Sequence, residues 1–173
     1  MKLALNRPVT IVIIGAGGTG GYVIPHLYRI AFASNRRCRI IIADGDIVEE
    51  KNLVRQNFAE CDIGENKAQV MAERYSEVFG IETEYIPDFI ENEERLYGLF
   101  RFHGWDDDPK PIGILIGAVD NNSSRAVSYT HLALDSGISK VIFHKSLIGN
   151  CGWAEPDLKR SIAAFICELF SKA

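Results

Sequence analysis

The sequence predicts an α/β domain whose sheet is doubly wound and mostly parallel, with helices on both faces. Three observations support this prediction. Short apolar runs rich in β-branched residues alternate with stretches of helical periodicity, which is typical of βαβ units. The first apolar run leads directly into a glycine-rich turn. Acidic side chains follow several of the predicted strands, as in sheets that bind ligands at their carboxyl edge.

Length and composition favour one domain that spans residues 1–173, with 47% hydrophobic and 24% charged residues. The net charge of −4 includes no basic field, so we expect no binding to nucleic acid. No apolar run reaches the length of a membrane span, and we expect a cytoplasmic protein without a membrane segment. The four cysteines contain no Cys-x-x-Cys pair, which argues against a zinc site or a disulfide framework.

The elements follow one another in an alternating order. Residues 9–14 form a continuous run of β-branched residues, which predicts a strand buried on both faces. The other predicted strands are 39–43, 83–86, 112–118 and 141–143. The predicted helices are 18–33, 65–79, 90–102, one that follows Asn121 to Ser123, and a last one around 158–169. Residues 44–62 are expected to form a loop with short turns, and residues 103–111 a surface loop.

The glycine-rich turn GAGGTG, from Gly15 to Gly20, matches the pattern Gly-x-Gly-x-x-Gly between a strand and a helix. Gly15 allows the tight turn, Gly17 lets the backbone approach a phosphate, and Gly20 permits close packing of helix and strand. Helix amides at this position favour an anion, so Gly15, Gly17, Gly18 and Gly20 are candidate nucleotide ligands. This pattern predicts a Rossmann-like nucleotide-binding domain.

Asp44 ends the second predicted strand, where a carboxylate accepts hydrogen bonds from ribose hydroxyls. The glycine turn and Asp44 together indicate an adenosine nucleotide, but they fit NAD and ATP equally. The polar stretch from Asp44 to Lys67 distinguishes the two, because a dehydrogenase has no need of it. Arg55 and Lys67 are long enough to reach a triphosphate. A solvated loop with local charge pairs is the alternative interpretation of this stretch.

Asp120 follows the fourth predicted strand. The carboxyl ends of parallel strands are where open α/β sheets bind ligands. A carboxylate at this place can hold Mg²⁺ together with substrate phosphates. Asp120 is therefore the candidate magnesium ligand, and helix capping is its alternative role.

These segments resemble the ThiF/MoeB/ubiquitin-activating superfamily of adenylating enzymes, and the N-terminal part looks closest to the ThiF-like proteins of PRTRC gene systems. The resemblance spans residues 9–137 and rests on GAGGTG at Gly15–Gly20, DGDIVEEKNLVRQ at Asp44–Gln56, DIGENKA at Asp62–Ala68 and GAVDNNSSR at Gly117–Arg125. The polar residues between Asp44 and Lys67 are far more specific for this superfamily than the glycine turn alone.

The resemblance implies a role for each matching residue. Asp44 would bind the ribose of ATP and Asp46 would line the same site. The phosphates would be held by Asn52, Arg55, Gln56 and Lys67. Asp120 would bind Mg²⁺, and Arg55, Lys67 and Asp120 would carry the catalysis.

The activity that the resemblance implies is that of an adenylyltransferase. The C-terminal glycine carboxylate of a small ubiquitin-like or sulfur-carrier protein would attack the α-phosphate of ATP, giving an acyl-adenylate and pyrophosphate. Such enzymes usually form homodimers, and a homodimer is expected here. The attacking carboxylate is already ionised at neutral pH, so no general base is needed.

The sequence departs from the family pattern at several places. Only eight residues precede Val9, where relatives carry a helix, and the zinc-binding Cys-x-x-Cys pairs are missing. The C-terminal half of the family domain is expected to be missing after the fifth strand. Cys151 follows that strand, where a thioester role and a structural role are both conceivable.

Three rival functions stay open. One is activation of a small carboxylate, such as one carried on a modified tRNA. A second is an NAD(P)-dependent oxidoreductase, which explains the glycine turn and Asp44 but leaves Arg55, Lys67 and Asp120 unexplained. The third is a non-catalytic nucleotide-binding or scaffold protein.

Overall fold

The computed structural model describes residues 7–100, 112–119 and 138–142, and it contains a five-stranded sheet in the order β3-β2-β1-β4-β5. Every neighbouring pair of strands is parallel. The strands are β1 (Val9–Ile14), β2 (Cys38–Ala43), β3 (Glu82–Ile86), β4 (Ile112–Gly117) and β5 (Ile138–Ile142). The chain moves outward from β1 to β3 and then returns to place β4 on the other side of β1. This order reverses between β1 and β4, which confirms the doubly wound α/β prediction.

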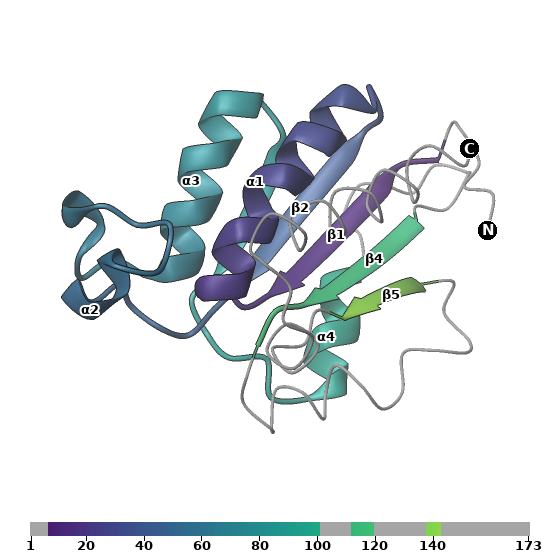
Figure 1. Ribbon diagram of the computed structural model, residues 1–173. Coiled ribbons are helices and arrows are strands. Elements are labelled where there is room, and N and C mark those ends of the chain that lie inside the picture. The colour runs from purple at the N-terminus through teal and green to yellow at the C-terminus, as the bar shows by residue number, and fades with distance from the viewer. Residues whose placement is uncertain (1–6, 101–111, 120–137, 143–173) are drawn as a thin grey trace, which may run out of the picture.

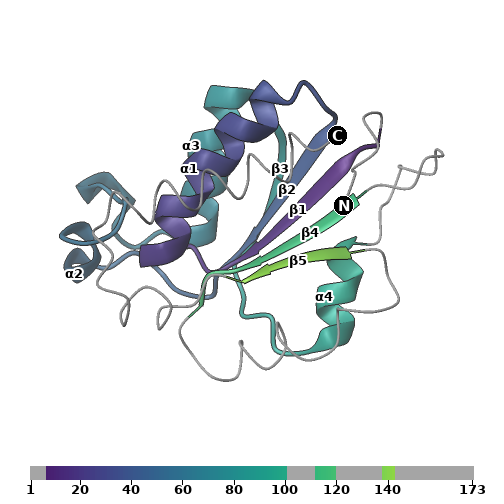
Figure 2. The same cartoon turned by 45° about the vertical axis from the view of Figure 1, so that its right-hand side comes forward.

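Helices cover both faces of the sheet. On one face lie α1 (Gly18–Ala33) and α3 (Lys67–Phe79), and on the other lies α4 (Glu93–Phe100) (Figures 1 and 2). The short helix α2 (Glu50–Leu53) and the 3₁₀ helix η1 (Glu60–Asp62) project beside the sheet, in the segment between β2 and α3 (Figure 1). The regular structure of that segment amounts to these two short helices, which agrees with the predicted loop with short turns.

Side chains that alternate along each strand divide the core into two layers. Ile11 and Ile13 of β1 belong to the cluster that includes α1 and α3, and both are fully buried. Val12 and Ile14 belong to the opposite cluster, which includes Leu96 of α4. A strand buried on both faces is nearly apolar throughout, which explains why β1 is a run of β-branched residues with Thr10 as its one buried polar side chain.

Most predicted boundaries agree with the structure to within two residues, and two elements begin three residues away from their predicted starts. The fifth strand begins at Ile138 rather than at residue 141, because backbone pairing with β4 carries it through Ser139 and Lys140. The helix predicted for residues 90–102 begins later, since the side chain of Asn92 accepts a hydrogen bond of 2.8 Å from the Arg95 amide and Ile90 packs into the core ahead of the helix. The helices predicted after Asn121 and around 158–169 lie outside the described residues.

Within the described ranges, none of the helices combines the length and the apolar character that a membrane span requires.

Candidate functional site

The carboxyl ends of β1, β2 and β4 converge where the strand order reverses (Figure 1). The Gly15 amide donates to the Ala43 carbonyl at 2.8 Å, which joins the start of the glycine loop to the end of β2. The Ala118 amide donates to the Ile14 carbonyl at 2.7 Å, which joins the loop to the end of β4. The glycine loop therefore lies at the place where open α/β sheets bind ligands.

Two glycines of this loop leave no room for a side chain. Gly15 has a φ of +98°, and a Cβ atom there would lie 2.8 Å from the Ala118 carbonyl oxygen. A Cβ atom on Gly20 would lie only 1.9 Å from the carbonyl oxygen of Gly15. Gly20 thus allows the first turn of α1 to press directly on the loop.

Gly17 and Gly18 face open space instead. Among the described residues, a Cβ atom on Gly17 would meet nothing nearer than the Gln56 amide at 3.9 Å, and one on Gly18 would meet nothing within 4 Å. α1 begins at Gly18, so the free amides of its first turn lie beside this space. The loop therefore presents backbone donors without a side chain to obstruct an anion.

Asp44, which follows β2, connects the glycine loop to the turn beyond it. Its Oδ2 atom accepts a hydrogen bond of 2.6 Å from the Ala16 amide, and its Oδ1 atom accepts one of 2.9 Å from the Asp46 amide. Burial raises the pKa of this carboxyl above its usual range, although the two amide hydrogen bonds and the charge of Lys67 act in the opposite direction.

Lys67, the first residue of α3, is an almost completely buried cation. Its side chain is 7% exposed, and its Nζ atom lies 3.0 Å from Oδ2 of Asp46. Asp46 is more exposed, which leaves its carboxylate in reach of solvent at one side. The structure therefore brings both residues to the site as an ion pair, a contact that the spacing in the sequence does not reveal.

Asn66 is a site residue that the sequence analysis missed. Its Nδ2 atom donates to the carbonyls of Asp44 and Asp46, at 2.8 Å and 3.1 Å. Its Oδ1 atom accepts from the amides of Ala68 and Gln69 and thereby caps α3. An asparagine directly before an amphipathic helix is a typical N-cap, and that pattern could have identified it.

The three candidate phosphate ligands near α2 are in different environments. Asn52 is 2% exposed, and its Oδ1 atom accepts a hydrogen bond of 2.9 Å from the Glu49 amide. Arg55 is exposed, and its guanidinium makes no hydrogen bond or ion pair with any other described residue. Oε1 of Gln56 is buried without a hydrogen-bond partner in the described part of the chain, and the amide faces Gly17.

Asp120 and Cys151 lie outside the described residues, so the structure says nothing of the predicted magnesium ligand. Among residues 7–100, 112–119 and 138–142, no group of three or more His, Cys, Asp or Glu side chains is arranged to hold a metal ion. Asp44 and Asp46, which follow β2, both have hydrogen-bond or ionic partners among these residues.

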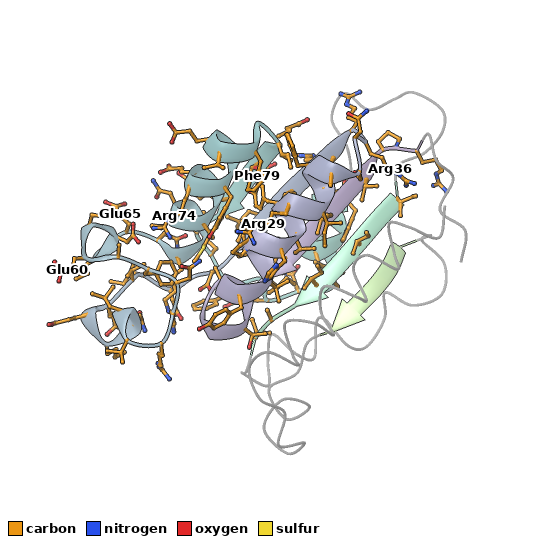
Figure 3. All side chains as sticks on the ribbon, turned by 45° about the horizontal axis from the view of Figure 1, so that its top comes forward. Arg29, Arg36, Glu60, Glu65, Arg74 and Phe79 are labelled. Carbon is orange, nitrogen blue, oxygen red and sulfur yellow. The ribbon has the colours of Figure 1, made fainter. Side chains whose placement is uncertain are left out.

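The segment with α2 and η1 is fastened to α3 by Arg74. Its guanidinium donates to Oδ2 of Asp62 at 2.5 Å and to the Asn57 carbonyl at 2.9 Å. Figure 3 shows Arg74 between α3 and the segment that carries Glu60 and Glu65. Burial of Asp62 would raise its pKa, but the hydrogen bonds from Ala59 and Arg74 outweigh it and the pKa is lowered.

Replacing Asp62 with asparagine should reduce the free energy of unfolding by about 1–3 kcal/mol at pH 7, because a charge-assisted hydrogen bond is lost. A carboxyl whose pKa is lowered on folding stabilises the protein above its ordinary pKa of 3.8, and that contribution disappears as the pH falls through the lowered value. Urea unfolding at several pH values would measure the free energy of unfolding of the unchanged protein and of Asp62→Asn. The difference between them should shrink below pH 3.8, and a difference that grows there would contradict the ion pair.

The fold and the site define a class: a Rossmann-like α/β domain with a glycine loop and a polar turn at its switch point. The family model of the ThiF family matches residues 4–139. The chain therefore belongs to the ThiF family. No curated protein matches the sequence significantly.

The solved structures similar to this chain include the tRNA N6-threonylcarbamoyladenosine dehydratase TcdA of E. coli. Its complex with AMP has a TM-score of 0.60, 23% identity, and coverage of 78% of this chain and 50% of that chain. Its complex with ATP has a TM-score of 0.58 with the same identity and coverage. These similarities support the fold, and the chain spans about half the length of the TcdA structures.

Proposed function

We propose that this chain binds ATP at the Gly15–Gly20 loop and uses it to adenylate a carboxylate. The observation that carries the proposal is the Asp44 carboxylate, which joins the glycine loop to the turn at Asp46. Asp46 in turn pairs with Lys67 at the start of α3. A nucleotide loop and a polar turn with a buried cation thus form one continuous site. Membership of the ThiF family and the resemblance to TcdA, which has been solved with ATP and with AMP, support the same ligand.

Each residue has a distinct part in this proposal. The open backbone at Gly17 and Gly18 would receive the phosphates, and Asp44 would accept hydrogen bonds from the ribose. The exposed guanidinium of Arg55, which has no partner within the described part of the chain, suits bidentate contact with a phosphate. Lys67 would add a fixed positive charge, Gln56 a hydrogen bond, and Asn52 would shape the turn that carries both Arg55 and Gln56.

The proposed reaction needs no nucleophile from the protein. A carboxylate oxygen of the substrate attacks the α-phosphorus of ATP, and the bond from that phosphorus to the bridging oxygen of the β-phosphate breaks. Pyrophosphate leaves with the electron pair of that bond, and an acyl-adenylate remains. Catalysis then consists of positioning and charge neutralisation, which the cations and backbone amides of the site can supply.

The substrate that we propose is the C-terminal glycine carboxylate of a small ubiquitin-like or sulfur-carrier protein, with the chain acting as a cytoplasmic homodimer. The alternative substrate is a small carboxylate carried on a modified tRNA, as the name of TcdA suggests for that enzyme. The net charge of −4 favours the protein substrate, because a tRNA-binding surface is normally basic.

Two measurements on the full chain test the proposal. Calorimetry would compare binding of ATP–Mg²⁺ with binding of NAD⁺ and NADH. Exchange of pyrophosphate into ATP would then be measured with purified ubiquitin-like proteins and, separately, with tRNA. Binding of NADH without binding of ATP would refute the proposal in favour of an oxidoreductase. Binding of ATP without exchange for any carboxylate would favour a non-catalytic protein.

Asp120 provides a prediction about the metal. We propose that this carboxylate holds Mg²⁺ beside the phosphates, so Asp120→Ala should abolish the part of the ATP affinity that depends on Mg²⁺. Titrations of ATP with Mg²⁺ and with EDTA would measure the Mg²⁺-dependent part of the affinity. Glu82→Ala is a matched control, because Glu82 is an exposed carboxylate that pairs with Arg39 at the start of β3, away from the site. An unchanged response to Mg²⁺ in Asp120→Ala would show that another group holds the metal.

A further inference from the structure

Phe89 is an exposed aromatic residue at the same edge of the sheet as the glycine loop and Asp44. It follows β3 and is 44% exposed, although its ring packs closely over Gly45. A Cβ atom on Gly45 would lie 2.5 Å from Cδ2 and 2.6 Å from Cε2 of that ring. Gly45 therefore provides the space in which the ring lies, directly beside Asp44.

The segment that carries Phe89 is fixed on both sides. Before it, the Ile86 carbonyl accepts a hydrogen bond of 3.1 Å from the Asp44 amide. After it, Ile90 is 1% exposed and belongs to the core cluster shared with α4. Arg95 also pairs with Asp88 at 2.7 Å. A ring with this support is held in one place while part of its surface stays exposed at the ligand-binding edge of the sheet.

The order of the strands places Phe89 relative to a nucleotide. The glycine loop follows β1, Asp44 follows β2 and Phe89 follows β3, and these strands are consecutive neighbours in the sheet. A nucleotide with its phosphates at the glycine loop and its ribose at Asp44 runs from β1 towards β2. Its base, attached to the far side of the ribose, then continues towards β3, where the ring of Phe89 is exposed.

We infer that Phe89 is the stacking surface for the purine base of the nucleotide, and that Gly45 is a glycine because it seats this ring. The inference rests on the proposed function, since it assumes a nucleotide at Asp44. Stacking on an aromatic face depends little on the identity of the base, because every base has a π-face. Phe89 therefore contributes equally to binding of adenine and guanine nucleotides, and any discrimination between them comes from other groups.

The first test replaces Phe89 with alanine in the full chain and measures affinity by calorimetry. ATP and GTP should each bind about tenfold more weakly, which corresponds to ~1.4 kcal/mol. Inorganic tripolyphosphate, which has no base, should bind as it does to the unchanged protein. Phe32→Ala is the matched control, because Phe32 is another exposed phenylalanine and lies on α1 at the opposite end of the sheet.

The second test moves the ring without removing it. Gly45→Ala introduces a methyl group at the place of the ring, so ATP affinity should fall by a similar factor. In a protein that already carries Phe89→Ala, the added methyl group has room, and Gly45→Ala should then cost little further. This non-additivity is the result expected of two residues that act through one contact.

The outcomes separate the inference from the proposed function. If the unchanged protein binds neither ATP nor GTP, the proposed function fails. If it binds ATP and Phe89→Ala binds equally well, the inference alone is overturned. A loss of tripolyphosphate affinity in Phe89→Ala would also overturn it, because the residue would then support the loop rather than the base. If Gly45→Ala still lowers ATP affinity in a protein that lacks the Phe89 ring, Gly45 does not serve to make room for that ring.

Discussion

Replacing Gly20 with alanine should lower the free energy of unfolding by about 3 kcal/mol and remove nucleotide binding. The new methyl group would lie 1.9 Å from the carbonyl oxygen of Gly15, which is a backbone atom and cannot rotate away. Either α1 must move outward or the glycine loop must change its path. Both changes would pull apart the loop and the Asp44 carboxylate that holds it.

Gly18→Ala is the matched control, because it adds the same methyl group two residues earlier in the same helix. A Cβ atom on Gly18 would meet nothing within 4 Å in the described part of the chain, and alanine lowers the entropy of the unfolded chain. This variant should be unchanged or more stable by about 0.5 kcal/mol. Urea unfolding of both variants measures the difference. Equal stability of Gly20→Ala and Gly18→Ala would show that α1 does not lie against the carbonyl of Gly15.

Replacing Arg55 with alanine should reduce the exchange of pyrophosphate into ATP roughly 100-fold, as expected when one donor to a developing charge is removed. Arg55 is exposed, and within the described residues its guanidinium has no hydrogen bond or ion pair. The melting temperature should therefore stay unchanged, since surface substitutions of this kind affect stability by about 0.5 kcal/mol or less. A loss of activity without a loss of stability is what distinguishes a phosphate ligand from a structural residue.

Two variants sharpen this test. Lys51→Ala removes a cation from the neighbouring turn of α2, where Lys51 pairs with Glu49 at 2.8 Å, and should leave exchange unchanged. Arg55→Lys keeps the charge but loses the planar fork of donors, so it should restore only part of the activity. An Arg55→Ala protein that exchanges pyrophosphate at the normal rate would rule out the proposed role of Arg55.

Apolar periodicity was sufficient to predict the sheet. The prediction for β1 has the observed bounds. A strand buried on both faces appears in the sequence as a continuous run of β-branched residues, as in Val9–Ile14. β5 was predicted too short, because Ser139 and Lys140 interrupt the apolar pattern while the backbone continues to pair with β4. Backbone pairing is a tertiary interaction, and the local pattern of residues does not report it.

The sequence predicts which residues belong to the candidate site, but it does not predict the contacts between them. The burial of Lys67 and its pairing with Asp46 depend on how α3 packs, which involves residues 21 positions apart. The contact between Phe89 and Gly45 likewise joins two strand ends that are distant along the chain. The N-cap position of Asn66 is a local pattern, but its hydrogen bonds to the carbonyls of Asp44 and Asp46 join residues 22 and 20 positions apart. The sequence alone does not reveal these contacts.

The hydrogen bonds of Asp44 have a consequence for the energetics of binding. Each of its carboxylate oxygens accepts one backbone amide, from Ala16 or from Asp46, and an ionised carboxylate oxygen can accept a second donor. A ribose hydroxyl bound there would add to the existing bonds rather than displace them. The glycine loop and the turn at Asp46 would then already be rigid in the free protein. Little conformational entropy would be lost on binding, and the backbone would differ little between the free and bound forms.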